Sequence, residues 1–225
     1  MKSFQAKVKK SHDVIKKTFK KYPADKVVVA WTGGKDSTVL LHLVKEAFGG
    51  KVPFPVMFND STMEFEEIYS FIKELKNQWR INLTVVPHNK KDLSSFYKEK
   101  NLKKRKELSR LMKINVINAF LKKHKIKAFM AGIRWDEHTA RSQEQYFSPR
   151  SNHIRIHPIL HFTEKDIWRY IKKYKVPYVS LYDRGYRSLG EKPFTKRTQT
   201  GQGERSGREF DKEQTMDKLR MMGYW

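Results

Sequence analysis

The chain contains 225 residues, of which 38% are hydrophobic and 13% aromatic, enough for the core of one large α/β domain. It has no cysteine, which predicts that it forms no disulfide, thiolate zinc site, iron–sulfur cluster or thiol nucleophile. Lys and Arg outnumber Asp and Glu by 48 to 24; the excess would attract polyanions, or could reflect a lysine-rich surface alone. Without an apolar run of about 20 residues or a secretory signal, we expect a cytoplasmic protein with no membrane span.

The spacing of apolar residues predicts alternating helices and strands along most of the chain. Helices are expected at residues 3–22, Ser37–Phe48, Glu64–Trp79, Lys106–His124 and Thr163–Tyr174. A short apolar run predicts a buried parallel strand at Lys26–Trp31, and further strands are expected at Pro53–Phe58, Ile81–Val86, Ile126–Ala131 and Ile154–Pro158. Such alternation predicts a doubly wound α/β fold, with a mainly parallel five-stranded sheet and helices on both faces.

The C-terminal part of the chain follows a different pattern. Residues 183–208 are rich in Gly, Arg, Thr and Ser and show no regular period, which predicts a long functional or mobile loop. A last helix is expected at Asp211–Met222. We therefore expect an α/β domain over residues 1–180 and a C-terminal substrate loop and tail over residues 181–225.

A glycine-rich turn follows the first expected strand. Its sequence is Trp31-Thr32-Gly33-Gly34-Lys35-Asp36-Ser37-Thr38. Glycines let the backbone approach an anion, and the N-terminus of the following helix supplies positive potential. Lys35 can neutralise phosphate charge, whereas Asp36 could hold Mg²⁺ or orient the loop. The turn is neither a Walker A motif nor a GxGxxG motif, and an ordinary glycine-rich turn remains the alternative.

The same turn resembles the SGGKDS signature of the PP-loop ATP pyrophosphatase superfamily, with Thr32 in place of the first serine. Within it, residues 20–225 resemble the phosphoadenosine-phosphosulfate reductase family. The resemblance implies an adenine nucleotide alpha hydrolase-like fold and a nucleotide-binding domain over residues 1–180. It implies ATP binding by Trp31, Thr32, Gly33, Gly34, Asp36, Ser37, Thr38, Asp60 and Gly132. Asp60 could instead cap the next helix.

Arginines mark the second group of expected site residues. The run Gly132–Glu137, followed by Arg141, resembles a Gly-x-Arg-x-Asp-Glu…Arg segment of ATP sulfurylases and reductases. Planar guanidinium groups suit phosphate and sulfate. The implied catalytic residues are Lys35, Asp36, Arg134, Arg141, Arg184 and Arg187. The implied anion-binding residues are Arg134, Arg155, Arg184, Arg187, Arg205 and Arg208. We expect Asp36 and Arg134 to lie at strand ends, outside the core.

Three histidines follow, at positions 153, 157 and 161, spaced by four residues. No carboxylate accompanies them in the sequence, so hydrogen-bonding roles are favoured over a zinc site. Asp36 is the residue expected to bind Mg²⁺, and Asp136 and Glu137 are the alternative, either holding Mg²⁺ or orienting the arginines.

The absence of cysteine limits which reactions of this family the chain can catalyse. Where relatives continue Gly-Cys-x-Pro-Cys-Thr, this chain has Gly190-Glu191-Lys192-Pro193-Phe194-Thr195. Reductive release of sulfite in this family needs a nucleophilic cysteine, so that activity is rejected. The resemblance then implies adenylyl transfer, in which ATP with Mg²⁺ is cleaved between its α- and β-phosphates and pyrophosphate leaves.

The acceptor stays open among three classes. Sulfate is favoured by residues 132–141 and by the tail at 203–225, which resemble the small subunit of ATP sulfurylase. FMN is favoured by Tyr182–Gly190, which resembles FMN adenylyltransferases. Nucleic acid, in tRNA or DNA sulfur modification, is the third. The sulfurylase resemblance implies a GTPase large subunit as partner; a homodimer is also open.

Overall fold

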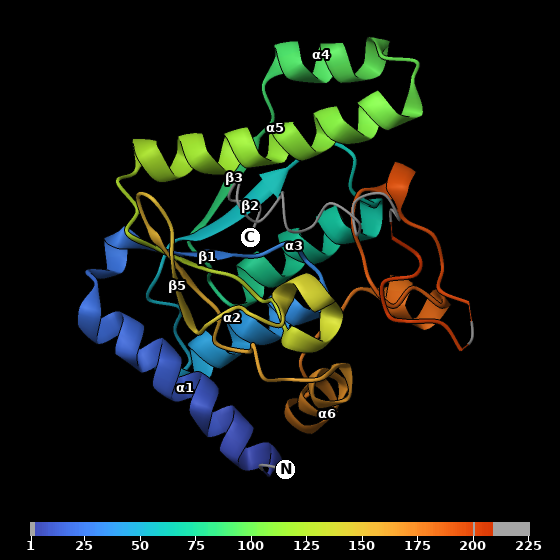
Figure 1. Ribbon diagram of the computed structural model, residues 1–225. Coiled ribbons are helices and arrows are strands. Elements are labelled where there is room, and N and C mark those ends of the chain that lie inside the picture. The colour runs from blue at the N-terminus through green and yellow to red at the C-terminus, as the bar shows by residue number, and fades with distance from the viewer. Residues whose placement is uncertain (1–2, 200, 209–225) are drawn as a thin grey trace.

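The computed structural model describes residues 3–199 and 201–208 and is built around a six-stranded sheet with strand order β3-β2-β1-β4-β6-β5 (Figure 1). Strand β5 pairs antiparallel with β6, and the other neighbouring strands are parallel. The strands are β1 (Val27–Ala30), β2 (Val56–Asp60), β3 (Leu83–Pro87), β4 (Ala128–Met130), β5 (Phe147–Pro149) and β6 (Ile154–Ile156).

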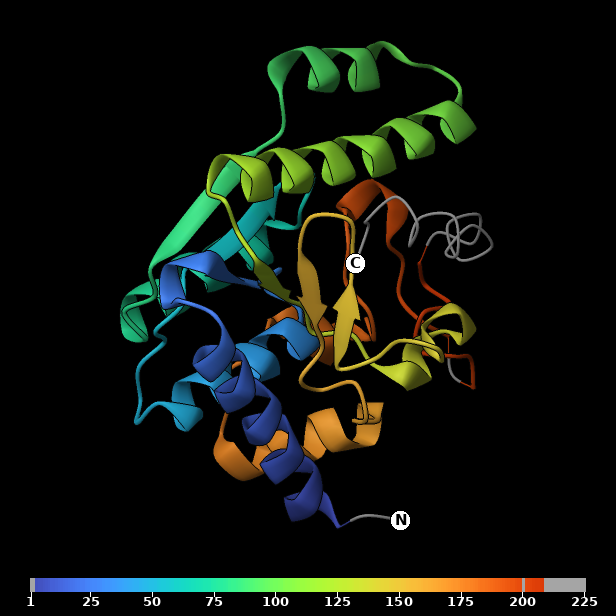
Figure 2. The same cartoon turned by 60° about the vertical axis from the view of Figure 1, so that its left-hand side comes forward.

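Helices cover both faces of this sheet, as Figures 1 and 2 show. One face packs against α1 (Phe4–Lys21), α2 (Lys35–Ala47), α3 (Glu66–Gln78) and α6 (Glu164–Tyr174). The other face packs against α5 (Leu102–Lys123), and α4 (Lys90–Lys98) lies outside α5. Short 3-10 helices connect these elements: Ala24–Lys26, Trp135–Glu137, Thr139–Arg141, Ser180–Arg184 and Lys192–Phe194.

The strand sequences explain this two-sided packing. In β1, Val27 and Val29 join the core that faces α2, and Val28 joins the core beneath α5. Successive side chains of a strand point to opposite faces, so a strand covered on both faces is apolar throughout. The expected α/β fold, with a mainly parallel sheet and helices on both faces, is therefore confirmed.

Three details differ from the sequence-based prediction. The sheet has six strands instead of five, because β5 is a three-residue edge strand that ends in proline and shows no apolar alternation. Helix α4 was not expected, because only Phe96 of its nine residues is buried. Helix α5 begins at Leu102 rather than Lys106. The helix expected at Asp211–Met222 lies outside the described residues.

Two helical connections on opposite faces of the sheet determine where a ligand can bind. The chain leaves β1 towards β2 through α2 on one face, and it reaches β4 from β3 through α5 on the other. The carboxyl ends of the neighbouring strands β1 and β4 therefore lie side by side at the point where the connections go to opposite faces. This is the usual place for ligands in open α/β sheets. Across residues 3–199 and 201–208, no helix combines the length and apolar character that crossing a bilayer requires.

Candidate active site

The glycine-rich turn forms a tight connection between β1 and α2. Gly33 has a φ of +75°, and a Cβ there would lie 2.9 Å from Ile68 Cγ2, so both conformation and space favour glycine. The Thr32 hydroxyl lies 3.1 Å from the Ser37 hydroxyl, which closes the turn from within. At the first residue of α2, the Lys35 backbone N–H donates to the Tyr182 hydroxyl at 2.8 Å. An oxygen therefore already occupies one anion-binding position of this helix N-terminus.

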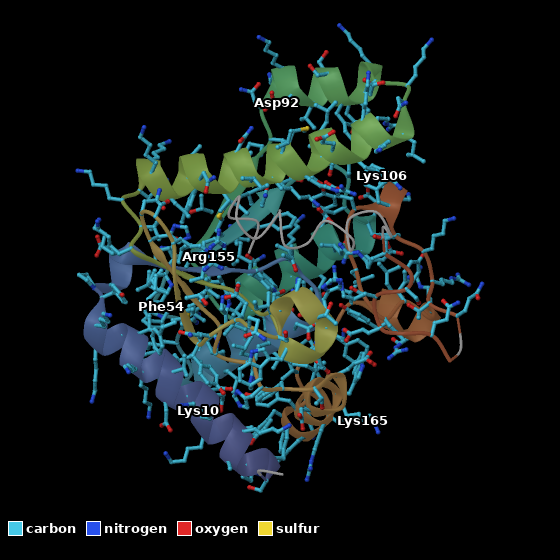
Figure 3. All side chains as sticks on the ribbon, in the orientation of Figure 1. Lys10, Phe54, Asp92, Lys106, Arg155 and Lys165 are labelled. Carbon is cyan, nitrogen blue, oxygen red and sulfur yellow. The ribbon has the colours of Figure 1, made fainter. Side chains whose placement is uncertain are left out.

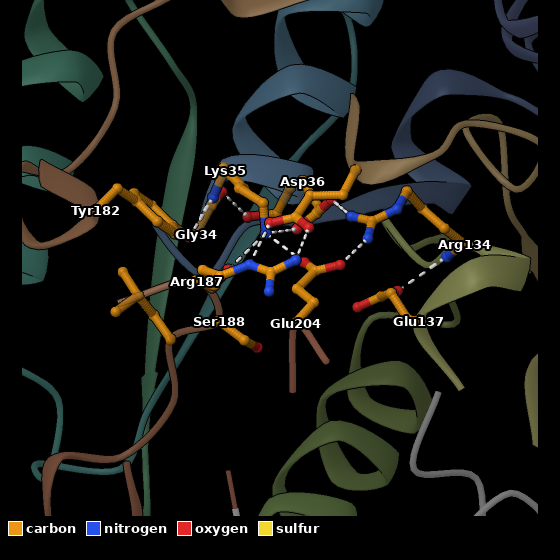
Figure 4. A network of polar contacts seen from close by, with 12 residues as sticks. Gly34, Lys35, Asp36, Arg134, Glu137, Tyr182, Arg187, Ser188 and Glu204 are labelled. Atoms are coloured by element: carbon orange, nitrogen blue, oxygen red, sulfur yellow. Dashed lines mark hydrogen bonds and ion pairs between the residues drawn. The ribbon is translucent and has the colours of Figure 1, made fainter. Parts of the chain in front are cut away.

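The Lys35 side chain lies at the centre of a charged network beside the turn (Figure 4). It is 1% exposed, and its ammonium lies 3.2 Å from Asp36 Oδ2. The ammonium donates to the Arg187 carbonyl oxygen at 2.8 Å and forms an ion pair with Glu204. A buried ammonium requires such partners because desolvation penalises an unpaired charge.

Arg134 enters the same network from the loop after β4 (Figure 4). Its guanidinium contacts Asp36 and Glu204, and its Nε donates to Asp136 Oδ1 at 2.9 Å. Burial alone would lower the pKa of Arg134, but the carboxylates of Glu137, Glu204 and Asp136 outweigh it and raise that pKa. The expectation that Arg134 lies outside the core was wrong, since this residue is 0% exposed.

A second cluster of charges centres on Glu137. Its carboxylate accepts the Arg134 backbone N–H at 2.9 Å, forms an ion pair with Arg141 and lies 3.5 Å from Arg205 Nη1. Burial would raise the pKa of Glu137, but Arg141, Arg134 and Arg205 lower it to about 2. Glu137 therefore remains an anion that fixes two arginines next to the site.

A cavity of about 260 Å³ opens beside these clusters. One wall is apolar, and it comes from strand ends and α5: Ala30, Met57, Phe58, Ile117, Phe129 and Ala131. Cationic groups line the same cavity: Lys113, Arg141, Arg155, Arg205 and Arg208. The cavity thus joins an apolar surface suited to a planar base with cations suited to an anion.

Arg155 belongs to this cavity although it is fully buried. Figure 3 places it near the middle of the molecule, whereas the labelled Lys10, Lys106 and Lys165 lie on the helices α1, α5 and α6. Its guanidinium carbon lies 4.1 Å from the centre of the Phe129 ring. Burial, with a smaller contribution from Arg150, lowers the pKa of Arg155 to about 9 against the opposing effect of Glu144.

The structure brings most of the expected residues together. Those that line the cavity are Thr32, Gly34, Asp36, Ser37, Gly132, Arg141, Arg155, Arg205 and Arg208. Lys35 and Arg134 meet next to it through Asp36 and Glu204, whereas Arg187 reaches Lys35 only through its carbonyl oxygen and pairs its guanidinium with Glu164. Gly132 can approach α2 because it lacks a side chain: a Cβ there would lie 3.0 Å from the Asp36 carbonyl oxygen.

Five other expected residues do not line the cavity: Trp31, Gly33, Thr38, Asp60 and Arg184. Trp31 is buried in the core, where its ring N–H donates to the Thr38 hydroxyl at 3.0 Å. Asp60 accepts the Thr62 backbone N–H and the Tyr69 hydroxyl, both at 2.8 Å, but it does not cap α3, whose N-cap residue is Phe65. Arg184 is half exposed and pairs with Glu67 on α3 at 2.7 Å. In the structure these residues shape or border the site without lining its cavity.

The histidines have separate hydrogen-bonding or ionic partners. His153 Nδ1 lies 2.7 Å from Asn152 Oδ1, and His161 Nε2 lies 2.9 Å from the Lys7 carbonyl oxygen. His157 is fully buried, with Nε2 3.6 Å from Glu144 Oε2. In the described part of the chain, no three His, Cys, Asp or Glu side chains gather to hold a metal ion. Mg²⁺ carried by ATP takes most ligands from phosphate and water, so the Asp36 carboxylate at the cavity fits as its single protein ligand.

Several residues of the site were missed by sequence reasoning. Tyr182 and Glu204 lie within segments recognised by resemblance, but no role was assigned to them. Glu204 precedes Arg205, and it is a rare acidic residue in a basic segment, which is the signal that could have marked it. Lys113 could not be distinguished, because α5 contains lysines on its exposed surface as well.

Residues 26–197 match the family profile of the phosphoadenosine phosphosulfate reductase domain. The adenosine 5'-phosphosulfate reductase of Halalkalibacterium halodurans is 29% identical over 206 residues, covering 89% of this chain and 87% of that protein. Sulfate adenylyltransferase subunit 2 of Pseudomonas putida is 32% identical over 195 residues. That match covers 75% of this chain but only 63% of the relative.

Solved structures show the same fold. The phosphoadenylyl-sulfate reductase of Candida auris, in a phosphate complex, superimposes with a TM-score of 0.68 at 18% identity, covering 81% of this chain and 88% of that one. The FMN adenylyltransferase of Candida glabrata, in complex with FMN and the ATP analogue AMPCPP, gives a TM-score of 0.65 at 21% identity, covering 89% and 70%. With residues 26–197 matched, the chain belongs to the phosphoadenosine phosphosulfate reductase domain family of the PP-loop superfamily.

Proposed function

We propose that the chain catalyses ATP-dependent adenylyl transfer, cleaving ATP between the α- and β-phosphates and releasing pyrophosphate. The observation that carries this proposal is the convergence of Lys35 and Arg134 beside the N-terminus of α2. Both cations are almost fully buried, and both are placed next to a cavity with an apolar wall. Such an arrangement suits the phosphates of a nucleotide whose base lies against the apolar wall.

The proposed chemistry needs little acid–base catalysis. An oxyanion of the acceptor attacks the α-phosphorus, a new P–O bond forms, and the bond to the bridging oxygen breaks with its electron pair leaving on pyrophosphate. Lys35, Arg134 and the backbone N–H groups at α2 stabilise the negative charge that moves onto the leaving group. Asp36 holds Lys35 and Arg134 in place and is the ligand we assign to ATP-bound Mg²⁺.

Sulfate is the acceptor that we propose. Supporting it are the relative named sulfate adenylyltransferase subunit 2 and the arginines that reach the cavity. Because that relative is named as a subunit, we also propose a second subunit as partner, and a GTPase remains the partner that the sequence resemblance implies. The fold shared with FMN adenylyltransferase keeps FMN as the alternative acceptor. A relative is named adenosine 5'-phosphosulfate reductase, but the given sequence lacks the cysteine that such reduction requires in this family.

Pyrophosphate release tests this proposal. The purified chain is given ATP and Mg²⁺ with sulfate, FMN or tRNA in turn, and we expect release that depends on sulfate and is weak in the absence of the partner subunit. Arg134→Lys keeps a positive charge but removes the fork that reaches several carboxylates. We expect this variant to lose about 10²–10³-fold in kcat, the range for removing one preorganised donor.

The matched control is Arg80→Lys, a change of the same kind after the end of α3. It should release pyrophosphate at the wild-type rate. Full activity of Arg134→Lys, with any acceptor that supports turnover, would contradict the site assignment.

A further inference from the structure

Glu204 places a carboxylate where the proposed phosphate site has its two cations. One carboxylate oxygen contacts the Lys35 ammonium, and the other contacts the Arg134 guanidinium (Figure 4). The Glu204 side chain is only 9% exposed. A single carboxylate therefore bridges two buried cations that follow the neighbouring parallel strands β1 and β4.

This bridge occupies both cations next to the cavity. Lys35, Arg134 and Glu204 do not line the cavity themselves, although Asp36, which pairs with both cations, does. An anion that enters the cavity must replace the Glu204 carboxylate before it can contact both cations. The cations are not stranded by this exchange, because Asp36 pairs with both and Asp136 also pairs with Arg134.

We propose that Glu204 is a specificity-determining residue that selects polyphosphates over single tetrahedral oxyanions at the Lys35–Arg134 site. The inference rests on the proposed function and deepens it by naming the class of anion that this subsite accepts. The Glu204 carboxylate competes with any incoming anion for the two cations. An anion binds there only if its interaction free energy with the site exceeds that of the carboxylate it replaces. Pyrophosphate has two linked phosphates that can contact both cations and the α2 N-terminus together. Sulfate or inorganic phosphate is a single tetrahedral group and cannot make all of these contacts together.

Such selection would matter for the proposed reaction. Sulfate is itself the proposed acceptor, so an unguarded pair of buried cations would bind it where the ATP phosphates belong. With Glu204 present, sulfate is directed to the other cations of the cavity, among them Arg141 and Arg155. Specificity then comes from a group that opposes the wrong ligand as well as from groups that attract the right one.

Titration calorimetry with sodium pyrophosphate and sodium sulfate tests the inference. We expect Glu204→Gln to tighten sulfate binding by about tenfold, equivalent to about 1.4 kcal/mol, and to make sulfate a competitor of pyrophosphate. The wild type should bind pyrophosphate without competition from sulfate. Glu74→Gln is the control, since it changes the net charge equally at an exposed position of α3. It should match the wild type for both anions.

Two outcomes would overturn the inference. One is a Glu204→Gln variant whose sulfate affinity equals or falls below that of the wild type, which would make Glu204 a structural partner only. The other is a wild type in which sulfate already competes with pyrophosphate. If Glu204→Gln does not fold, Glu204→Asp carries the same test, because its shorter side chain cannot bridge both cations in the same geometry.

The inference and the proposed function can fail separately. If Glu204→Gln gains sulfate binding but no acceptor supports pyrophosphate release by the wild type, the proposed reaction fails and the inference stands. If the wild type releases pyrophosphate and Glu204→Gln binds anions as the wild type does, the reaction stands and the inference fails.

Discussion

At the scale of single residues, the site is a set of buried charges that compensate one another. Arg134 contacts the carboxylates of Asp36, Asp136 and Glu204, and Glu137 accepts its backbone N–H. Removing one member of a buried ionic network leaves its partners desolvated and unpaired, which is strongly destabilising. Arg134→Ala would therefore disturb folding as well as ligand binding, and Arg134→Lys is the more informative substitution.

Glu137 gives this charge network a measurable pH dependence. The pKa of its carboxyl is about 2 in the folded chain, against an ordinary value of 4.5. A lowered carboxyl pKa contributes stability above the unfolded pKa, and this contribution is lost as the pH falls through the folded pKa. Glu137→Gln should therefore lower the free energy of unfolding near pH 7, and its difference from the wild type should shrink between about pH 4.5 and about pH 2.

Urea unfolding at a series of pH values measures that difference. Glu74→Gln, an exposed change of the same kind, should run parallel to the wild type throughout. A constant gap between Glu137→Gln and the wild type across the acidic range would contradict the assigned role of Glu137.

At the scale of elements, the site depends on how closely the end of β4 approaches the start of α2. A Cβ on residue 132 would lie 3.0 Å from the Asp36 carbonyl oxygen and 3.1 Å from Ser37 Cα. Gly132→Ala should push the first turn of α2 away from the sheet, at a cost of about 1–3 kcal/mol in folding free energy. Because this turn holds Lys35 and Asp36, ATP affinity should fall by about tenfold or more, in line with that cost.

Thermal unfolding and ATP titration check the prediction for Gly132→Ala. Gly203→Ala is the matched control, since no atom lies within 4 Å of its added Cβ. Unchanged ATP affinity in Gly132→Ala would show that the contact between β4 and α2 does not set the geometry of the turn.

Elements with a strong sequence period were predictable, and elements formed by tertiary contacts were not. The central strands and α2, α3 and α6 follow from apolar runs and helical spacing, because each buries a continuous face. The N-cap at Thr163 is reinforced by Asp166, whose side chain accepts the Thr163 backbone N–H at 2.9 Å. Strand β5 is held by its pairing with β6, and α4 is held by its residue Phe96, which packs against Met63 and Met112. Neither contact leaves a periodic signal.

At the scale of the whole molecule, the site assembles from segments distant in sequence. The glycine-rich turn and the Gly132–Arg141 segment could be placed together because parallel strands end at the same edge of a sheet. Glu204 could not be placed, since it is 169 residues from Lys35 and follows no regular element. The same limit applies to Arg184 and Arg187, which are three residues apart: only Arg187 reaches the Lys35 network, through its carbonyl oxygen.

The central claim concerns which bond of ATP is broken, and ATP labelled at the α-phosphorus tests it most directly. The labelled products formed with sulfate, FMN or tRNA are separated and identified. We expect label in an adenylylated acceptor or in AMP, with unlabelled pyrophosphate as the other product. Labelled ADP accompanied by inorganic phosphate would contradict it, because the bond between the β- and γ-phosphates would then be the one that breaks.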